Sequence, residues 1–153
     1  MLGYIRNLLS GGSSNESSRP NKEQKIQVAT CALLMEIAAA DDHFSEPEKN
    51  KIIDIMKNTF NLSSEYVEEL IEITREKISS SVSIYEFTDT INLNFTREEK
   101  LEVLLNIWRL IFVDDVMDKY EEFLVRRIAG NLKLEHSDLI QSKMEARAER
   151  KHK

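Results

Sequence analysis

The chain has 153 residues, of which 41% are hydrophobic and 31% are charged, and its formal net charge is −6. This length and composition are typical of one globular domain and exclude collagen-like, low-complexity and largely disordered chains. The negative charge argues against a broad nucleic-acid surface, so we expect no nucleic-acid partner. The single cysteine, Cys31, excludes a disulfide scaffold and a cysteine-rich zinc finger, and its apolar neighbours predict a buried, structural thiol.

Residues 1–21 divide into an apolar start and a polar linker. In residues 1–9, the side chains of Leu2, Ile5, Leu8 and Leu9 share one helical face, and Arg6 lies on the polar side. Residues 10–21 hold five serines, two glycines and a proline, a composition typical of a flexible linker. We expect residues 1–9 to be either a disordered start or a weak contact for a partner or a membrane surface.

Residues 22–142 form the predicted domain, because their apolar residues recur with the spacing of amphipathic helices. No stretch alternates apolar and polar residues as a half-buried strand does. The predicted fold is therefore all-α, a compact bundle of about seven helices. The apolar stretches cover residues 26–40, 52–60, 67–78, 84–95, 101–112, 124–132 and 139–144.

Four capping boxes predict where helices begin. In this motif a cap side chain accepts a backbone N–H, and a Glu three residues later reaches back to the cap. The pairs are Ser45 with Glu48, Ser83 with Glu86, Thr96 with Glu99, and Asp118 with Glu121.

Residues 143–153 form a predicted basic tail with five basic and two acidic side chains. Such a charge run is usually a solvated helix end, and the alternative is a contact for an anionic partner or membrane surface.

An internal duplication relates residues 31–48 to residues 104–121 at an offset of 73. Each copy is an apolar helix, an Asp–Asp pair, a cap, a Glu and a second helix. The repeated acidic residues are Asp41, Asp42 and Glu48 in the first copy and Asp114, Asp115 and Glu121 in the second. We expect two helical hairpins about a pseudo-twofold axis, filled and linked by the helices between residues 63 and 95. The same offset matches Glu36 with Arg109, which predicts a salt bridge near this axis.

The two acidic turns are candidate metal sites. Each Asp–Asp pair follows the end of an apolar helix, where the helix dipole favours a cation over a carboxylate. Carboxylates and free helix-end carbonyls are oxygen ligands that suit Ca²⁺, Mg²⁺ or Mn²⁺. The predicted ligands are therefore the six repeated acidic residues, and His43 could add a nitrogen ligand in the first copy.

A turn without metal explains part of the same pattern. Glu48 and Glu121 occupy the third helical position, where capping and the helix dipole both favour a carboxylate. The Asp side chains could bond the turn backbone as Asx-turns. The spacing does not match the EF-hand loop, because Val116 and Val125 stand where that loop needs oxygen ligands.

The repeated motif resembles the TerB-like domain of tellurite-resistance proteins. The residues A-A-A-D-D-x-F-S-E-P-E and F-V-D-D-x-M-D-K-Y-E are similar to that family's A-D-G-x-I-x-x-x-E, which often occurs twice, and the resemblance covers about residues 24–145. It implies a compact, pseudo-twofold bundle of about seven helices in soluble bacterial proteins linked to tellurite and general stress responses. It also implies metal binding at Asp41, Glu48, Asp114 and Glu121. The family's Gly is Asp42 or Asp115 here, as expected of a divergent member.

These observations favour a non-enzymatic, cytoplasmic stress-response module that binds a divalent cation and regulates the surface it offers to a protein partner. The alternative is a metal-independent adaptor that binds proteins, or the inner membrane surface through residues 1–9. A metal-dependent hydrolase ranks last, because no separate general base or substrate-binding group can be named.

Overall fold

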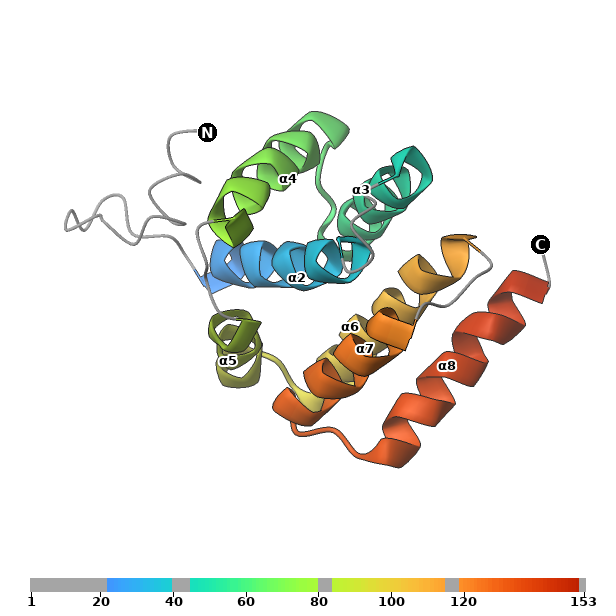
Figure 1. The fold of residues 1–153 in the computed structure, drawn as a ribbon. Coiled ribbons are helices and arrows are strands. Elements are labelled where there is room, and N and C mark those ends of the chain that lie inside the picture. The colour runs from blue at the N-terminus through green and yellow to red at the C-terminus, as the bar shows by residue number, and fades with distance from the viewer. Residues whose placement is uncertain (1–21, 40–44, 80–83, 115–118, 152–153) are drawn as a thin grey trace.

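The structure is a computed structural model that describes residues 22–39, 45–79, 84–114 and 119–151. This part of the chain is all-α and contains no strand, which confirms the predicted fold class (Figure 1). Its elements are α2 (Lys22–Ala38), α3 (Glu46–Phe60), α4 (Ser64–Ser79), α5 (Ile84–Asn94), α6 (Arg97–Ile111), the short 3₁₀-helix η2 (Phe112–Asp114), α7 (Lys119–Asn131) and α8 (His136–Lys151).

Two of the predicted capping boxes are confirmed. The Ser45 hydroxyl accepts the Glu48 backbone N–H at 3.3 Å, and Glu48 Oε1 accepts the Ser45 backbone N–H at 3.1 Å. Thr96 and Glu99 form the same reciprocal pair at the start of α6, with distances of 3.2 and 2.8 Å. These contacts satisfy backbone donors that a helix start leaves unpaired. Ser83 and Asp118, the caps of the other two boxes, lie outside the described residues.

The core is built around α2 and α6. From Val28 to Ala38 every side chain of α2 is buried except Glu36, and from Val103 to Ile111 every side chain of α6 is buried except Arg109. A helix with so wide an apolar surface must be covered on several sides. Accordingly, α2 packs against α3, α4, α5 and α6, and α6 packs against α8, α7 and α3 (Figure 1).

The helix bounds repeat along the chain. α2 ends at Ala38 and α6 at Ile111, whereas α3 begins at Glu46 and α7 at Lys119, so both boundaries keep the offset of 73. These bounds agree with the predicted duplication, which itself stays a prediction.

The repetition extends to a third helix. Left-handed residues follow α3 and α7, namely Asn61 with φ 57° and Lys133 with φ 62°. α4 and α8 then begin at Ser64 and His136 and each has 16 residues. These bounds define two sets of three helices that the predicted duplication pairs, namely α2–α4, the first triplet, and α6–α8, the second triplet. The sequence predicts α4 as a linking helix, whereas the structure packs it against α2 and packs α8 against α6.

No described helix is long and apolar enough to span a bilayer. The predicted domain boundary between residues 142 and 143 falls inside α8, which continues to Lys151.

Candidate functional site

The structure describes only part of the two predicted acidic turns. Asp41, Asp42 and Asp115 lie outside the described residues, as does His43. Asp114 ends η2, but its side chain is not among those the structure describes. Their role as metal ligands therefore stays a prediction. The two glutamates that follow these turns are described, and the structure places them in equivalent positions.

Glu48 and Glu121 are both buried in the first turn of the helix after their turn. Their side chains are only 2% and 5% exposed. A carboxylate is costly to bury unless hydrogen bonds or a cation compensate the lost hydration. Glu48 Oε1 receives two such bonds from Ser45, one from the backbone N–H at 3.1 Å and one from the hydroxyl at 2.9 Å. Helix capping therefore compensates the burial of the Oε1 atom of Glu48.

In the described ranges, no three His, Cys, Asp or Glu residues group together so as to hold a metal ion. The described residues alone thus supply one buried carboxylate to each turn. Any metal site there needs the Asp pairs as well.

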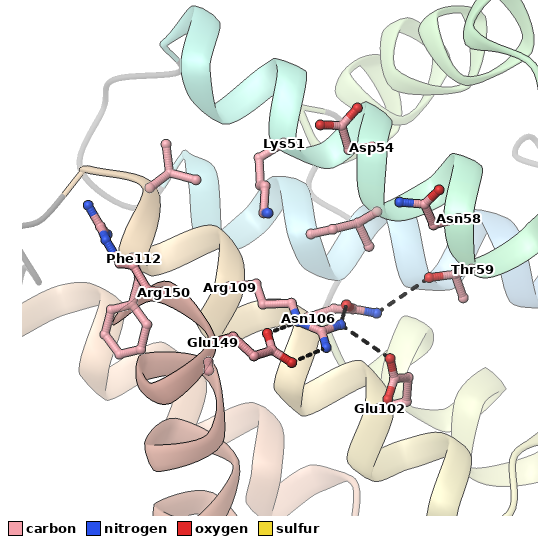
Figure 2. Close-up of a pocket in the computed structure, with 13 residues that line it drawn as sticks. Lys51, Asp54, Asn58, Thr59, Glu102, Asn106, Arg109, Phe112, Glu149 and Arg150 are labelled. Atoms are coloured by element: carbon pink, nitrogen blue, oxygen red, sulfur yellow. Dashed lines mark hydrogen bonds and ion pairs between the residues drawn. The ribbon is translucent and has the colours of Figure 1, made fainter. Parts of the chain in front are cut away.

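A polar groove lies between α3 of the first triplet and α6 and α8 of the second (Figure 2). It has a volume of about 740 Å³, and we call it the α3–α6 groove. Its lining combines charged side chains of both signs with a few apolar ones. The lining residues used below are Asp54, Ile55, Asn58 and Thr59 of α3, Glu102, Asn106 and Arg109 of α6, Phe112 of η2, and Ala146 and Glu149 of α8.

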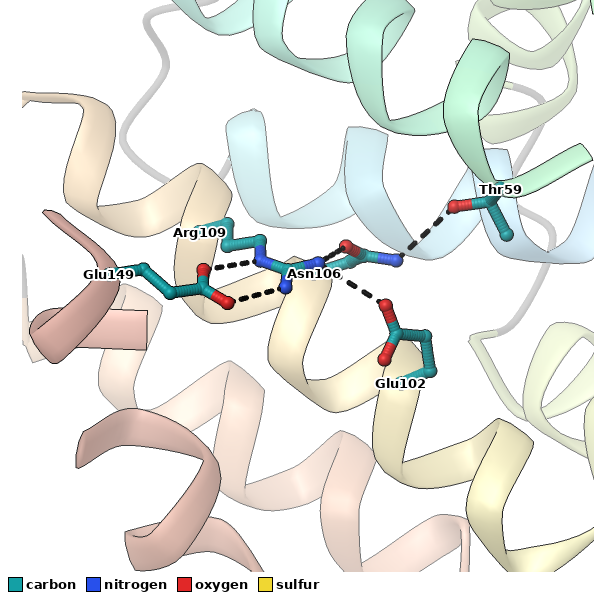
Figure 3. A network of polar contacts seen from close by, with 5 residues as sticks. All are labelled: Thr59, Glu102, Asn106, Arg109 and Glu149. Atoms are coloured by element: carbon teal, nitrogen blue, oxygen red, sulfur yellow. Dashed lines mark hydrogen bonds and ion pairs between the residues drawn. The ribbon is translucent and has the colours of Figure 1, made fainter. Parts of the chain in front are cut away.

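Arg109 is the centre of a polar network in this groove (Figure 3). Its Nε and Nη2 donate to the two carboxylate oxygens of Glu149 at 2.8 and 2.7 Å, a bidentate pair. Its Nη1 donates to Asn106 Oδ1 at 2.7 Å and to Glu102 Oε1 at 3.2 Å. Asn106 Nδ2 in turn donates to Thr59 Oγ1 of α3 at 3.4 Å. The hydrogen bond to Glu149 is the main reason that the pKa of Arg109 is raised.

This network shows that the predicted salt bridge between Glu36 and Arg109 is wrong. Arg109 pairs with Glu149 and Glu102, and Glu36 stays half-buried with a carboxyl pKa that burial raises. The physical reason is that α8 packs against α6 and brings Glu149 to Arg109, whereas Glu36 lies on a different helix, α2. Positions that the offset matches need not meet each other.

The basic end of α8 also contacts α6 and η2. The Lys143 ammonium lies 5.3 Å from the centre of the Trp108 ring, and the Arg147 guanidinium lies 5.6 Å from that of Phe112. The two rings stack on each other with centres 5.8 Å apart. Cations over aromatic faces are attracted to the ring quadrupole. Part of the predicted basic tail therefore stabilises the domain itself.

Cys31 is buried, as predicted. Burial is the main cause that raises the pKa of its thiol to about 12. Because the thiolate is the reactive form, this thiol is inert at neutral pH.

Sequence reasoning missed the α3–α6 groove and the Arg109–Glu149 pair. The sequence carried no clear signal for either one. At an offset of 72 the helix bounds of α4 and α8 match, but their sequences share only one identical residue, Arg75 with Arg147.

One comparison with known proteins gave a match. A family model described as tellurite resistance protein TerB matches residues 27–144. The match runs from α2 into α8 and includes both acidic turns. A search of curated proteins and a search of solved structures each found no match.

Proposed function

The chain belongs to the TerB family of tellurite resistance proteins, and from this premise we propose that it is a non-enzymatic stress-response module that binds divalent cations. The proposed ligands are Asp41, Asp42 and Glu48 in the first turn, with Asp114, Asp115 and Glu121 in the second. The cation would be Ca²⁺, Mg²⁺ or Mn²⁺, since all the ligands are oxygens.

The observation that carries this proposal is the equivalent burial of Glu48 and Glu121. Each lies within one helical turn of a segment that begins with two carboxylates, so negative charge is concentrated where α2 and α6 end. A helix C-terminus already carries partial negative charge. A bound cation would offset both the repulsion between the clustered carboxylates and their repulsion by the helix end.

Cation binding would act on the relative position of helices. Each turn joins the first and second helix of a triplet, and α2 and α6 also pack against each other. A cation that fixes these turns would stabilise one arrangement of the two triplets and so set the surface that a protein partner meets. We propose this regulatory role in the cytoplasm, without catalysis.

The test is a thermal-unfolding series on metal-stripped protein with Ca²⁺, Mg²⁺, Mn²⁺ or Zn²⁺ added singly. An ion at about 100 times its dissociation constant stabilises the folded state by about 2.7 kcal/mol. Asp41→Asn and Asp114→Asn should each reduce the shift in melting temperature. Asp89→Asn, on the exposed face of α5, is the matched control and should keep it.

A lack of any shift, or a shift that survives in the double variant Asp41→Asn with Asp114→Asn, would contradict cation binding at the turns. If the variants were also as stable as the wild type, the Asp pairs would have no metal-dependent role.

A metal-independent adaptor is the second candidate, and exposed aromatic side chains on α7 favour it. Tyr120 and Phe123 are 57% and 58% exposed and lie side by side, with ring centres 6.5 Å apart. Aromatic residues of this kind are enriched in protein interfaces. Metal-independent capture of a partner that Phe123→Ser abolishes would favour this candidate.

A further inference from the structure

We propose that the α3–α6 groove is the docking site of the chain's own residues 1–9, which bind there as α5 binds in the equivalent place. The proposal is independent of metal binding. It rests on three observations: the offset that matches helices of the two triplets, the packing of α5 on α2 and α7, and the spacing of apolar residues in the segment before α2.

α5 belongs to neither triplet, because it lies between α4 and α6 in the chain, and no described helix corresponds to it. It packs against α2 of the first triplet and α7 of the second. Two contacts fix it on α7. Asn92 Nδ2 donates to the backbone oxygen of Asn131 at 2.8 Å, and the Arg127 guanidinium lies 5.5 Å from the centre of the Tyr85 ring.

The α3–α6 groove corresponds, in the predicted duplication, to the surface of α2 and α7 that α5 covers. At the offset of 73, Arg127 and Asn131 of α7 correspond to Asp54 and Asn58 of α3. Both of these α3 residues line the groove. The other wall is α6, which is the counterpart of α2 (Figure 2). One helix therefore covers the α2–α7 side, and the described residues leave the α6–α3 side open.

The chain order identifies the occupant. α5 directly precedes α6, with only residues 95 and 96 between them. The segment that directly precedes α2 is residues 1–21, which lie outside the described residues. Within it, residues 1–9 are the apolar part.

The apolar spacing of residues 1–9 matches that of α5. The apolar side chains that α5 packs against the core are Phe87 and Ile91, which are buried, and Ile84, which is partly buried; they stand at positions i, i+3 and i+7 from Ile84. Leu2, Ile5 and Leu9 have the same spacing. A short amphipathic helix binds a groove through such a face.

The groove offers complementary chemistry to this segment. Ile55, Phe112 and Ala146 supply apolar surface, and Asp54 supplies a carboxylate for Arg6. The linker is long enough. Residues 10–21 span about 40 Å when extended, whereas the 17 residues of α2 extend for about 26 Å.

The test is paramagnetic relaxation in the full chain. Asn7→Cys carries a nitroxide label, and the buried Cys31 does not compete for it. The label should reduce the amide signals of Asp54, Asn58, Glu102 and Asn106 at least twofold more than those of Arg127 and Asn131, their matched control on the side that α5 covers. Adding Ile5→Glu to the labelled chain should remove this difference.

Three results would overturn the proposal. The first is uniform or absent signal loss, which would mean that residues 1–9 do not dock. The second is loss centred on Tyr120 and Phe123, which would place the segment on α7. The third is a signal loss of the same size when the nitroxide is on one chain and the ¹⁵N is on another chain that carries no nitroxide. That result would mean that the groove binds residues 1–9 of a second copy.

Discussion

The third helices of the two triplets, α4 and α8, hold equivalent places by different means. α4 buries Val67, Leu70, Ile71 and Ile73, which are all large apolar side chains. α8 buries Leu139 and Ala146 as its apolar residues. It compensates with the bidentate pair between Arg109 and Glu149 and with two cations over aromatic rings. One arrangement of helices can thus be stabilised by apolar burial on one side and by charged contacts on the other.

This difference has a consequence for stability. Apolar burial contributes about 25 cal/mol per Å² and is not weakened by charge screening, whereas partly exposed ion pairs contribute little and are screened. We therefore expect α8 to open more readily than α4.

The largest expected effect compares Leu70→Ala with Ser142→Ala. These residues correspond at the offset of 72, and both are buried. Leu70→Ala removes a fully buried side chain and should lower the free energy of unfolding by about 3 kcal/mol. Ser142→Ala removes one hydrogen bond, from its hydroxyl to the Leu139 oxygen at 3.0 Å, and should cost about 1 kcal/mol or less. Urea unfolding followed by circular dichroism measures both. Equal losses would show that the two helices are held alike.

The second prediction concerns Arg109→Lys, which keeps the charge but loses the planar fork. Arg109 and Glu149 side chains are 27% and 41% exposed, so solvent screens the pair. We expect a loss of about 1 kcal/mol, with faster amide exchange in α8 than in α4. Arg126→Lys is the control, because its pair with Glu122 on α7 is a single contact made by a more exposed arginine. Unchanged exchange in α8 would contradict the role of the network.

A smaller effect, dependent on pH, is expected at Asp138 in the first turn of α8. The Glu135 backbone N–H, at 2.9 Å, is the main cause that lowers the pKa of this carboxyl, and Arg97 at 2.7 Å adds to it. A carboxyl with a lowered folded-state pKa stabilises the protein above its unfolded pKa of about 3.9. This stability is lost as the pH falls through the lower folded pKa.

Asp138→Asn removes the charge and replaces one of the two acceptor oxygens by an amide NH₂, so that only one of the hydrogen bonds from Arg97 and from the Glu135 backbone can be kept. It should cost about 0.5 kcal/mol at pH 7 and flatten the fall of stability below pH 4. Chemical unfolding at several pH values measures this. If the free energy of unfolding of the variant fell below pH 4 as steeply as that of the wild type, Asp138 would not be the source of this pH dependence.

The smallest expected effect is a lack of reaction at Cys31 in the first triplet. Because burial raises its pKa to about 12, the thiol stays protonated and enclosed at pH 8. We expect Ellman's reagent to react with it only when urea unfolds the chain. Rapid reaction in native buffer would show that α2 and α4 separate easily. This would contradict the expectation that α8 opens more readily than α4.

Much of the fold could be predicted from the sequence. The helical spacing identified every described α-helix, and Ser45 and Thr96 marked two helix starts that the structure confirms. The apolar spacing alone did not place the end of α8, although a solvated helix end was one of the two interpretations of residues 143–153. The last turns of α8 hold Ala146 and charged side chains, so apolar spacing fades after Met144 although the helix continues to Lys151.

The candidate site was less predictable, for a physical reason. Glu48 and Glu121 follow from local capping rules, which act over three residues. Arg109 and Glu149 are 40 residues apart and meet only because α8 packs on α6. No local pattern encodes such a contact, and an offset within a repeat identifies equivalent surroundings rather than neighbours.

The most direct test of cation binding at the acidic turns is a Mn²⁺ titration of metal-stripped protein followed by electron paramagnetic resonance, which counts the free ion. Mn²⁺ accepts the same oxygen ligands as Mg²⁺ and Ca²⁺. We expect the wild type to remove Mn²⁺ from solution and the double variant Asp41→Asn with Asp114→Asn to lose this capacity, while Asp89→Asn retains it. Equal free Mn²⁺ with the wild type and with the double variant would contradict the account.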